Sequence, residues 1–130
     1  MSKFDDDIAA WVKKAKEEPH KVMTAAYLQL ASAIIVRTPV KTGRARANWN
    51  AEINSPDIST TQQTDKRGTK AKREAARVAT KAKPGDTLYL TNNLPYIRGL
   101  EYNRRSNQAP RGMVRVTAAE WEAALRRANR

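Results

Sequence analysis

Two short segments, Thr38–Trp49 and Thr91–Val114, constrain the fold of this 130-residue chain more than any other part of it. Each combines proline, glycine or asparagine with aromatic side chains. Such residues are typical of tight turns and of places where packed elements meet, because they restrict or extend the available backbone conformations. Neither segment carries a pattern of catalytic side chains. We therefore expect both segments to be structural.

The first segment predicts the end of a long apolar helix and the start of a strand. Pro39 disfavours helical backbone at Thr38, so the helix should end there. Gly43 permits the positive φ that a tight reversal often needs, and Trp49 supplies a large apolar anchor on the strand. Taken alone, this pattern is also that of an ordinary helix-to-strand turn.

Together, the two segments resemble the neck or tail-completion proteins of tailed bacteriophages, the family that includes the lambda-type minor tail protein Z. That family carries a T-P-V-D-T-G element followed by tryptophan, then N-N-x-x-Y-x-x-x-L-E-Y-G and Q-A-P-x-G-M-V elements. The matching positions here, in the same order and spacing, are Thr38, Pro39, Val40, Thr42, Gly43, Trp49, Asn92, Asn93, Tyr96, Leu100, Glu101, Tyr102, Gln108, Ala109, Pro110, Gly112, Met113 and Val114. The chain departs from the pattern at Lys41, where the family usually has aspartate, and at Asn103, where it usually has glycine.

The resemblance implies a structural virion protein at the head–tail junction, assembled in the host cytoplasm. Its subunits would form a homo-oligomeric ring around the DNA channel, with six copies favoured and twelve left open. Its partners would be the neighbouring neck and tail proteins: an adaptor or stopper, a tail terminator and the tail tube. We expect no enzymatic activity, no cofactor and no metal, because the sequence lacks the corresponding motifs.

Length and composition set further bounds. A chain of 130 residues is one domain with a modest core. It has no cysteine, which excludes disulfides and thiolate metal sites and suits a reducing cytoplasm. No apolar run approaches the length of a membrane span, and the first residues are too acidic for a signal peptide. We therefore expect a soluble protein with no membrane partner.

The order of apolar and turn residues predicts an α+β fold: long N-terminal helices packed on a small antiparallel sheet, followed by a C-terminal helix. The expected helices cover 4–16, 20–37 with Pro19 at the first position, and 94–102 with Asn93 as cap; the expected strands cover 47–53 and 87–91. A third strand is expected near 113–116, and the last helix should begin after Thr117 as N-cap, with Glu120 completing a capping box. The resemblance implies that the two main strands pair.

Half of the net charge of +12 lies in twenty residues, 64–83, which carry eight basic and two acidic side chains. Val78 is the only large apolar residue between Lys70 and Lys83, so this stretch has little reason to dock on the core. We expect a basic, flexible hairpin excursion over about 55–85, partly helical at best, and deleting residues 64–83 should leave a folded subunit. Its basic residues are candidates for contact with DNA or a partner protein: Lys66, Arg67, Lys70, Lys72, Arg73, Arg77, Lys81 and Lys83.

Two interpretations of this basic stretch remain open. It could be a solvated, charge-rich loop, or it could contact the phosphates of a polyanion without reading sequence. No aromatic residue occurs between Thr64 and Lys83, which disfavours stacking on single-stranded bases and leaves the double-stranded backbone as the target. A small basic protein that binds double-stranded DNA is therefore the alternative to the virion protein.

Catalytic and metal-binding motifs are missing from the sequence. There is no phosphate-binding glycine loop, and His20 is the only histidine. Three carboxylates lie near expected turns or strand ends, namely Glu52, Asp86 and Glu101. We expect them to cap backbone groups or form salt bridges, which leaves a hydrolase as the least favoured of the three hypotheses.

Overall fold

The computed structural model describes residues 3–15, 17–103 and 106–128. Its elements, in chain order, are α1 (Lys3–Lys14), α2 (Pro19–Arg37), α3 (Arg44–Ala47), β1 (Trp49–Ile53), α4 (Thr69–Lys81), β2 (Leu88–Asn92), α5 (Ile97–Tyr102) and α6 (Val114–Ala128). The combination of helices with a small antiparallel sheet confirms the predicted α+β class. Within the described ranges, no helix combines the length and apolar character needed to span a bilayer.

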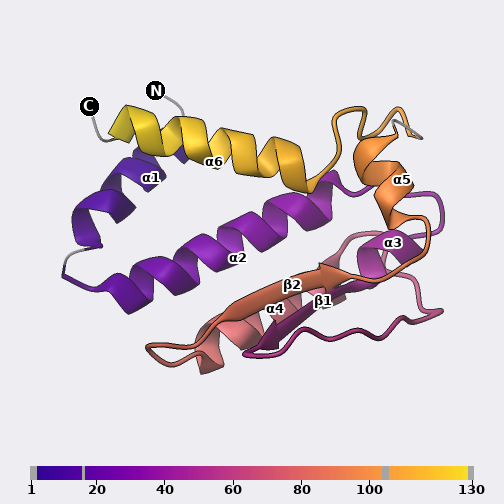
Figure 1. Ribbon diagram of the computed structural model, residues 1–130, viewed down its shortest axis with the longest axis horizontal. Helices are drawn as coiled ribbons and strands as arrows, with labels where there is room; N and C mark the ends of the chain where they lie inside the picture. The colour runs from indigo at the N-terminus through magenta and orange to yellow at the C-terminus, as the bar shows by residue number, and fades with distance from the viewer. Residues whose placement is uncertain (1–2, 16, 104–105, 129–130) are drawn as a thin grey trace.

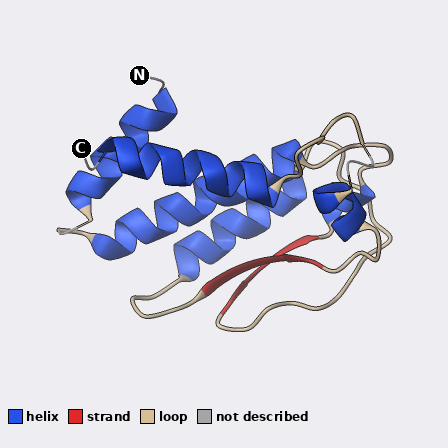
Figure 2. Ribbon diagram, turned by 45° about the horizontal axis from the view of Figure 1, so that its top comes forward, coloured by secondary structure: helices blue, strands red, loops and turns tan. Residues whose placement is uncertain are grey.

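The long helix α2 lies at the centre of the molecule (Figure 1). α6 and α1 pack on each other and cover one side of it, while α4 and the two strands lie on the other side. Figure 2 shows the two-stranded ribbon at the edge of the helical layers. At the α1–α6 contact, the centroid of the Trp121 ring lies 5.5 Å from that of Trp11 in a stacked pair and 6.0 Å from that of Phe4 in a T-shaped pair.

The bounds of α2 follow from the prolines that flank it. Pro19 occupies its first turn, as predicted, where its missing N–H has no helical partner to lose. Thr38 ends the helix in extended backbone, at φ −70° and ψ 126°, as the following Pro39 requires. Gly43 then adopts a φ of +92°, which confirms the positive φ expected in this turn.

The strands β1 and β2 pair antiparallel, with a register that runs from Trp49 opposite Asn92 to Ile53 opposite Leu88. Trp49 and Ala51 on β1 are buried, and the β2 leucines pack on the same core. The strand expected from residue 47 begins at Trp49 instead, because residues 44–47 form the short helix α3. The pairing that the resemblance implied is therefore present.

The expectation that residues 70–83 are partly helical at best and have little reason to dock on the core is wrong. Residues 69–81 form the regular helix α4, which packs against both α2 and β1. Its inner face consists of Ala71, Ala75 and Val78, all at most 3% exposed. Alanine is small enough to let two helices approach closely, and Ala31 faces it from α2. The segment thus belongs to the core without contributing large apolar side chains.

Four local expectations in the C-terminal half are also wrong. The described residues contain no third strand at 113–116, because α6 already begins at Val114. Thr117 lies inside this helix and donates its hydroxyl proton to the Met113 carbonyl at 2.7 Å, so it is not the N-cap. Glu120 completes no capping box and instead accepts from Arg37 at 2.6 Å. Asn93 does not cap α5, which begins after Tyr96 without a side-chain cap.

Candidate functional site

The two segments singled out in the sequence fold against each other at one end of the molecule. We call their contacts the junction, meaning the contacts between residues 38–49 and residues 92–114. Trp49 from the first segment packs in one core cluster with Ala109 and Met113 from the second. Ile35 of α2 and Ala71 of α4 complete this cluster. Residues about 60 positions apart in sequence are therefore parts of one buried unit.

Trp49 is fixed by a hydrogen bond as well as by packing. Its side chain is 6% exposed, and its indole Nε1 donates to the Thr38 hydroxyl at 2.8 Å. The same hydroxyl donates to the Ile34 carbonyl, also at 2.8 Å. Thr38 therefore satisfies both the indole and the last turn of α2, which is why a threonine before Pro39 suits this turn.

Polar side chains join the remaining parts of the junction. The Gln108 amide donates to the Val40 carbonyl at 3.1 Å and accepts from the Val40 N–H at 2.8 Å, so one side chain pairs with both backbone groups of one residue. Asn92 donates to the Ala45 carbonyl at 2.9 Å. These bonds hold the turn after α2 against the segments on either side of α5.

Glu101 caps the start of α6 from a distance in sequence. Its carboxylate accepts from the backbone N–H groups of Met113, Val114 and Arg115 at 3.0, 2.8 and 3.2 Å, and from the Arg115 Nε at 3.1 Å. Burial raises the pKa of Glu101, but the amide hydrogen bonds outweigh it, so the pKa lies below its ordinary value. A Cβ at Gly112 would lie 2.2 Å from this carboxylate, which explains the glycine.

The other two carboxylates are also structural. Asp86 accepts from the Lys83 N–H at 2.7 Å and from the Asn54 side chain at 2.9 Å. Glu52 lies 3.9 Å from the Arg77 guanidinium. The contacts of Glu52, Asp86 and Glu101 thus confirm the expected capping and salt-bridge roles. Among the described residues, no three histidine, cysteine or acidic side chains come together as a metal site.

Sequence reasoning missed Arg46, which is one of the most connected side chains of the junction. Its guanidinium donates to the carbonyls of Val36, Thr38 and Lys66 at 2.7 to 2.9 Å. It thereby satisfies carbonyls at the C-terminus of α2 and ties them to the segment before α4. A cation that follows a helix C-terminus weakly predicts a contact with the last helical carbonyls, but nothing in the sequence indicates which carbonyls Arg46 reaches.

Beside the junction the surface is hollowed by about 700 Å³. We call this the hollow; residues 39–45 line it on one side, and Tyr96, Leu100, Ser106 and Gln108 line it on the other. Tyr96, which lines the hollow, is 38% exposed. Tyr102 is also exposed but does not line the hollow, and the Arg115 guanidinium lies 4.7 Å from the centroid of its ring. Pro110 is exposed. The Asn93 side-chain amide donates to the Asp57 carbonyl and so contacts the loop after β1.

The basic residues of α4 form a stripe beside its buried alanine face. Lys70, Arg73, Arg77 and Lys81 lie three, four and four residues apart, which places them on one side of a helix. We call this stripe, with Lys66 and Arg67 just before the helix, the basic face. Lys72 and Lys83 lie off the stripe.

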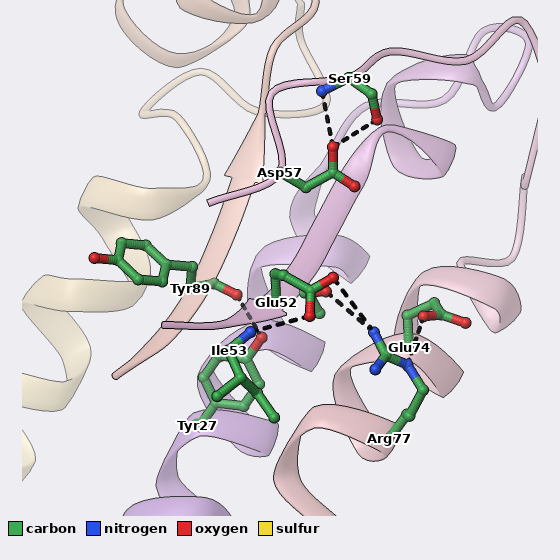
Figure 3. Close-up of polar contacts among 9 residues, drawn as sticks. Tyr27, Glu52, Ile53, Asp57, Ser59, Glu74, Arg77 and Tyr89 are labelled. Atoms are coloured by element: carbon green, nitrogen blue, oxygen red, sulfur yellow. Dashed lines mark hydrogen bonds and ion pairs between the residues drawn. The ribbon is translucent and has the colours of Figure 1, made fainter. Parts of the chain in front are cut away.

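Most cations of the basic face have no acidic partner. Arg77 pairs with Glu74 at 2.9 Å and with Glu52 at 3.9 Å (Figure 3). Lys70 donates to the Gln63 side chain, a neutral group. The other members make no ion pair with any residue in the described part of the chain. Lys70, Arg73 and Lys81 are therefore exposed on a regular helix, and Lys66 and Arg67 are exposed just before it.

Comparison with known proteins yields no match to a family model, to a curated protein or to a solved structure. The function has to be inferred from the junction and the basic face.

Proposed function

We propose that this chain is a structural virion protein of the head–tail junction of a tailed bacteriophage, where identical subunits form a ring around the DNA channel. The observation that carries the proposal is the junction itself. The residues behind the family resemblance are scattered over 38–114 in the sequence, yet many of them converge into one buried, hydrogen-bonded unit. This convergence is what a shared structural element would produce, and an accidental match of turn residues gives no reason for it.

The chemistry around the junction also favours a structural role. The Glu101 carboxylate accepts from backbone N–H groups, and the Thr38 hydroxyl accepts from the Trp49 indole. Side chains held in this way stabilise a scaffold. The proposed partners are therefore macromolecules: further copies of this chain, the adaptor or stopper, the tail terminator and the tail tube.

The basic face supports a place beside DNA. The stripe from Lys70 to Lys81 is about 16 Å long at about 1.5 Å per residue, which covers roughly five phosphates of one DNA strand at about 3.4 Å each. Contacts of this kind bind any sequence. In the proposed ring, the basic face of each subunit points into the channel and contacts the DNA backbone that passes through it.

The location is tested by imaging. Virions that carry this protein with a gold label should show the label on the tail axis, directly below the head. A label at the tail tip, on the head surface or absent from the particle contradicts the proposal. Native mass spectrometry of the assembled ring then distinguishes six copies from twelve.

The second candidate, a small protein that binds double-stranded DNA, is favoured by the unpaired cations alone. Mobility-shift titrations at two salt concentrations separate the two functions. A dedicated DNA-binding protein should bind tightly as a free subunit, whereas a ring subunit should bind weakly until it assembles.

The Lys70→Glu/Arg73→Glu variant tests the basic face in either case. Losing two phosphate contacts should make the negative slope of log affinity against log salt shallower by about two. The matched control is Lys13→Glu/Lys14→Glu on α1, which changes the net charge equally at exposed positions away from α4. Equal effects of the two variants would show that only net charge matters.

A further inference from the structure

Ile58 is the most exposed large apolar residue among those described, with 82% of its surface accessible. It lies in the segment between β1 and α4, flanked by Asp57 and Ser59. A single exposed isoleucine is common on protein surfaces. What distinguishes Ile58 is the rigidity of the loop that presents it.

Side chains from both strands, together with Asn93 just after β2, hold this loop. Thr91 and Asn93 each donate to the Asp57 carbonyl at 2.8 Å, and Asn50 donates to the Ser59 carbonyl at 3.0 Å. The Asp57 carboxylate accepts from the Ser59 hydroxyl and N–H at 2.6 and 2.8 Å (Figure 3). The hydrogen bond from the Ser59 hydroxyl, followed by the one from the Ser59 N–H, holds the pKa of Asp57 below its ordinary value. A fixed apolar tip beside a carboxylate loses little conformational entropy when it docks.

The hollow beside the junction has the complementary character. Pro39, Val40 and Leu100 give it apolar walls, and Lys41 and Arg44 give it positive charge. Arg44 donates to the Thr61 carbonyl and makes no ion pair with the residues that the structure describes. Lys41 is exposed and has no ion-pair partner in the described part of the chain. An apolar side chain that carries a neighbouring carboxylate matches both features.

We infer that the loop with Ile58 docks into the hollow of the next copy of this chain, with Ile58 against the apolar walls and Asp57 beside Lys41. This inference rests on the proposed self-assembly, and it specifies the two surfaces through which neighbouring copies bind each other. Asp57 and Ile58 do not line the hollow, so the contact joins two different sets of residues, is heterologous and repeats from copy to copy. Such a contact closes into a ring when the rotation between subunits permits it.

Cysteine cross-linking tests the contact directly, because the chain has no cysteine of its own. Ile58→Cys and Thr42→Cys are made as separate variants, since Thr42 is exposed and lines the hollow. When the two are mixed and oxidised, we expect one covalent dimer with one copy of each. A chain that carries both substitutions should give a ladder of longer oligomers. The matched control mixes Thr42→Cys with Thr80→Cys, an exposed position on α4.

The outcomes separate the contact from the proposed function. A mixed dimer no more abundant than the Thr80→Cys control, or dimers formed by Ile58→Cys alone, overturns the contact. Rings that assemble without the mixed cross-link leave the head–tail function standing and remove only this interface. As a second readout, Ile58→Ser should raise the concentration needed for assembly about tenfold without changing the thermal unfolding of the subunit. Unchanged assembly by this variant also contradicts the contact.

Discussion

Replacing Glu101 with glutamine is the sharpest test of how the junction is held. Glutamine keeps the shape of the side chain and can still accept from the N–H groups of Met113 and Val114. Its amide nitrogen, however, would face the N–H and guanidinium of Arg115, which are both donors. Hydrogen bonds to a charged group contribute about 1.5 to 3 kcal/mol, and a negative charge at a helix N-terminus contributes about 0.3 to 1 kcal/mol more. We expect Glu101→Gln to lower the free energy of unfolding by about 2 to 4 kcal/mol.

The pH dependence provides an independent check. The folded-state pKa of Glu101 lies below its unfolded value, so the stabilisation is complete above the unfolded pKa and is lost as pH falls through the folded pKa. The difference between wild type and Glu101→Gln should therefore be large at about pH 7 and should shrink as pH falls to about 3. Urea unfolding followed by far-UV circular dichroism at both pH values measures this difference.

Glu122→Gln is the matched control on the same helix. Glu122 pairs with Arg126 at 2.9 Å, but both side chains are about 70% exposed. A surface pair of this kind contributes about 0.5 kcal/mol or less. If Glu101→Gln is as mild as this control, or if its effect does not depend on pH, the carboxylate does not stabilise α6 in the way we describe.

Three further predictions concern packing and burial. Trp49→Ala should cost about 3 to 5 kcal/mol in urea unfolding, as for other large buried aromatic residues, and a near-neutral effect would place the indole at an interface. Val78→Ala should cost about 2 kcal/mol, and deleting residues 64–83 should abolish cooperative thermal unfolding, because α4 covers the core; a folded deletion variant would refute that role. Burial raises the pKa of Tyr27 to about 12, and its hydroxyl donates to the Tyr89 carbonyl at 2.7 Å, so stability should fall from about pH 10 to pH 12. Tyr27→Phe should cost about 1 kcal/mol at neutral pH and reduce this alkaline loss, whereas an unchanged alkaline profile would assign the loss to other groups.

The sequence predicted the parts of the fold that depend on local backbone chemistry. Pro19 and Pro39 bracket α2 because proline acts on its own residue and the one before it. Gly43 adopts the positive φ that its lack of a Cβ allows. The alternation of apolar residues predicted both strands to within two residues of their ends.

The start of α6 shows why local signals were insufficient elsewhere. Thr117 and Glu120 have the spacing of a capping box, yet the cap is Glu101, which is 13 residues before Val114. A carboxylate that approaches through space leaves no pattern near the helix it caps. Nothing in the sequence placed Gln108 against Val40 or Arg46 against the end of α2 either, because these contacts depend on how the chain turns back on itself.

From sequence alone, the chain was determined to be a basic, cysteine-free α+β domain with two turn-rich segments and carboxylates engaged in caps and salt bridges. Only the tertiary structure decided that these segments form one buried junction and that α4 belongs to the core. The physical reason is that Ala71 and Ala75 stabilise a helix contact through close approach to small residues such as Ala31, so their contribution depends on the shape of the partner surface. That docking turns the cations from Lys70 to Lys81 from a mobile charged loop into a fixed face.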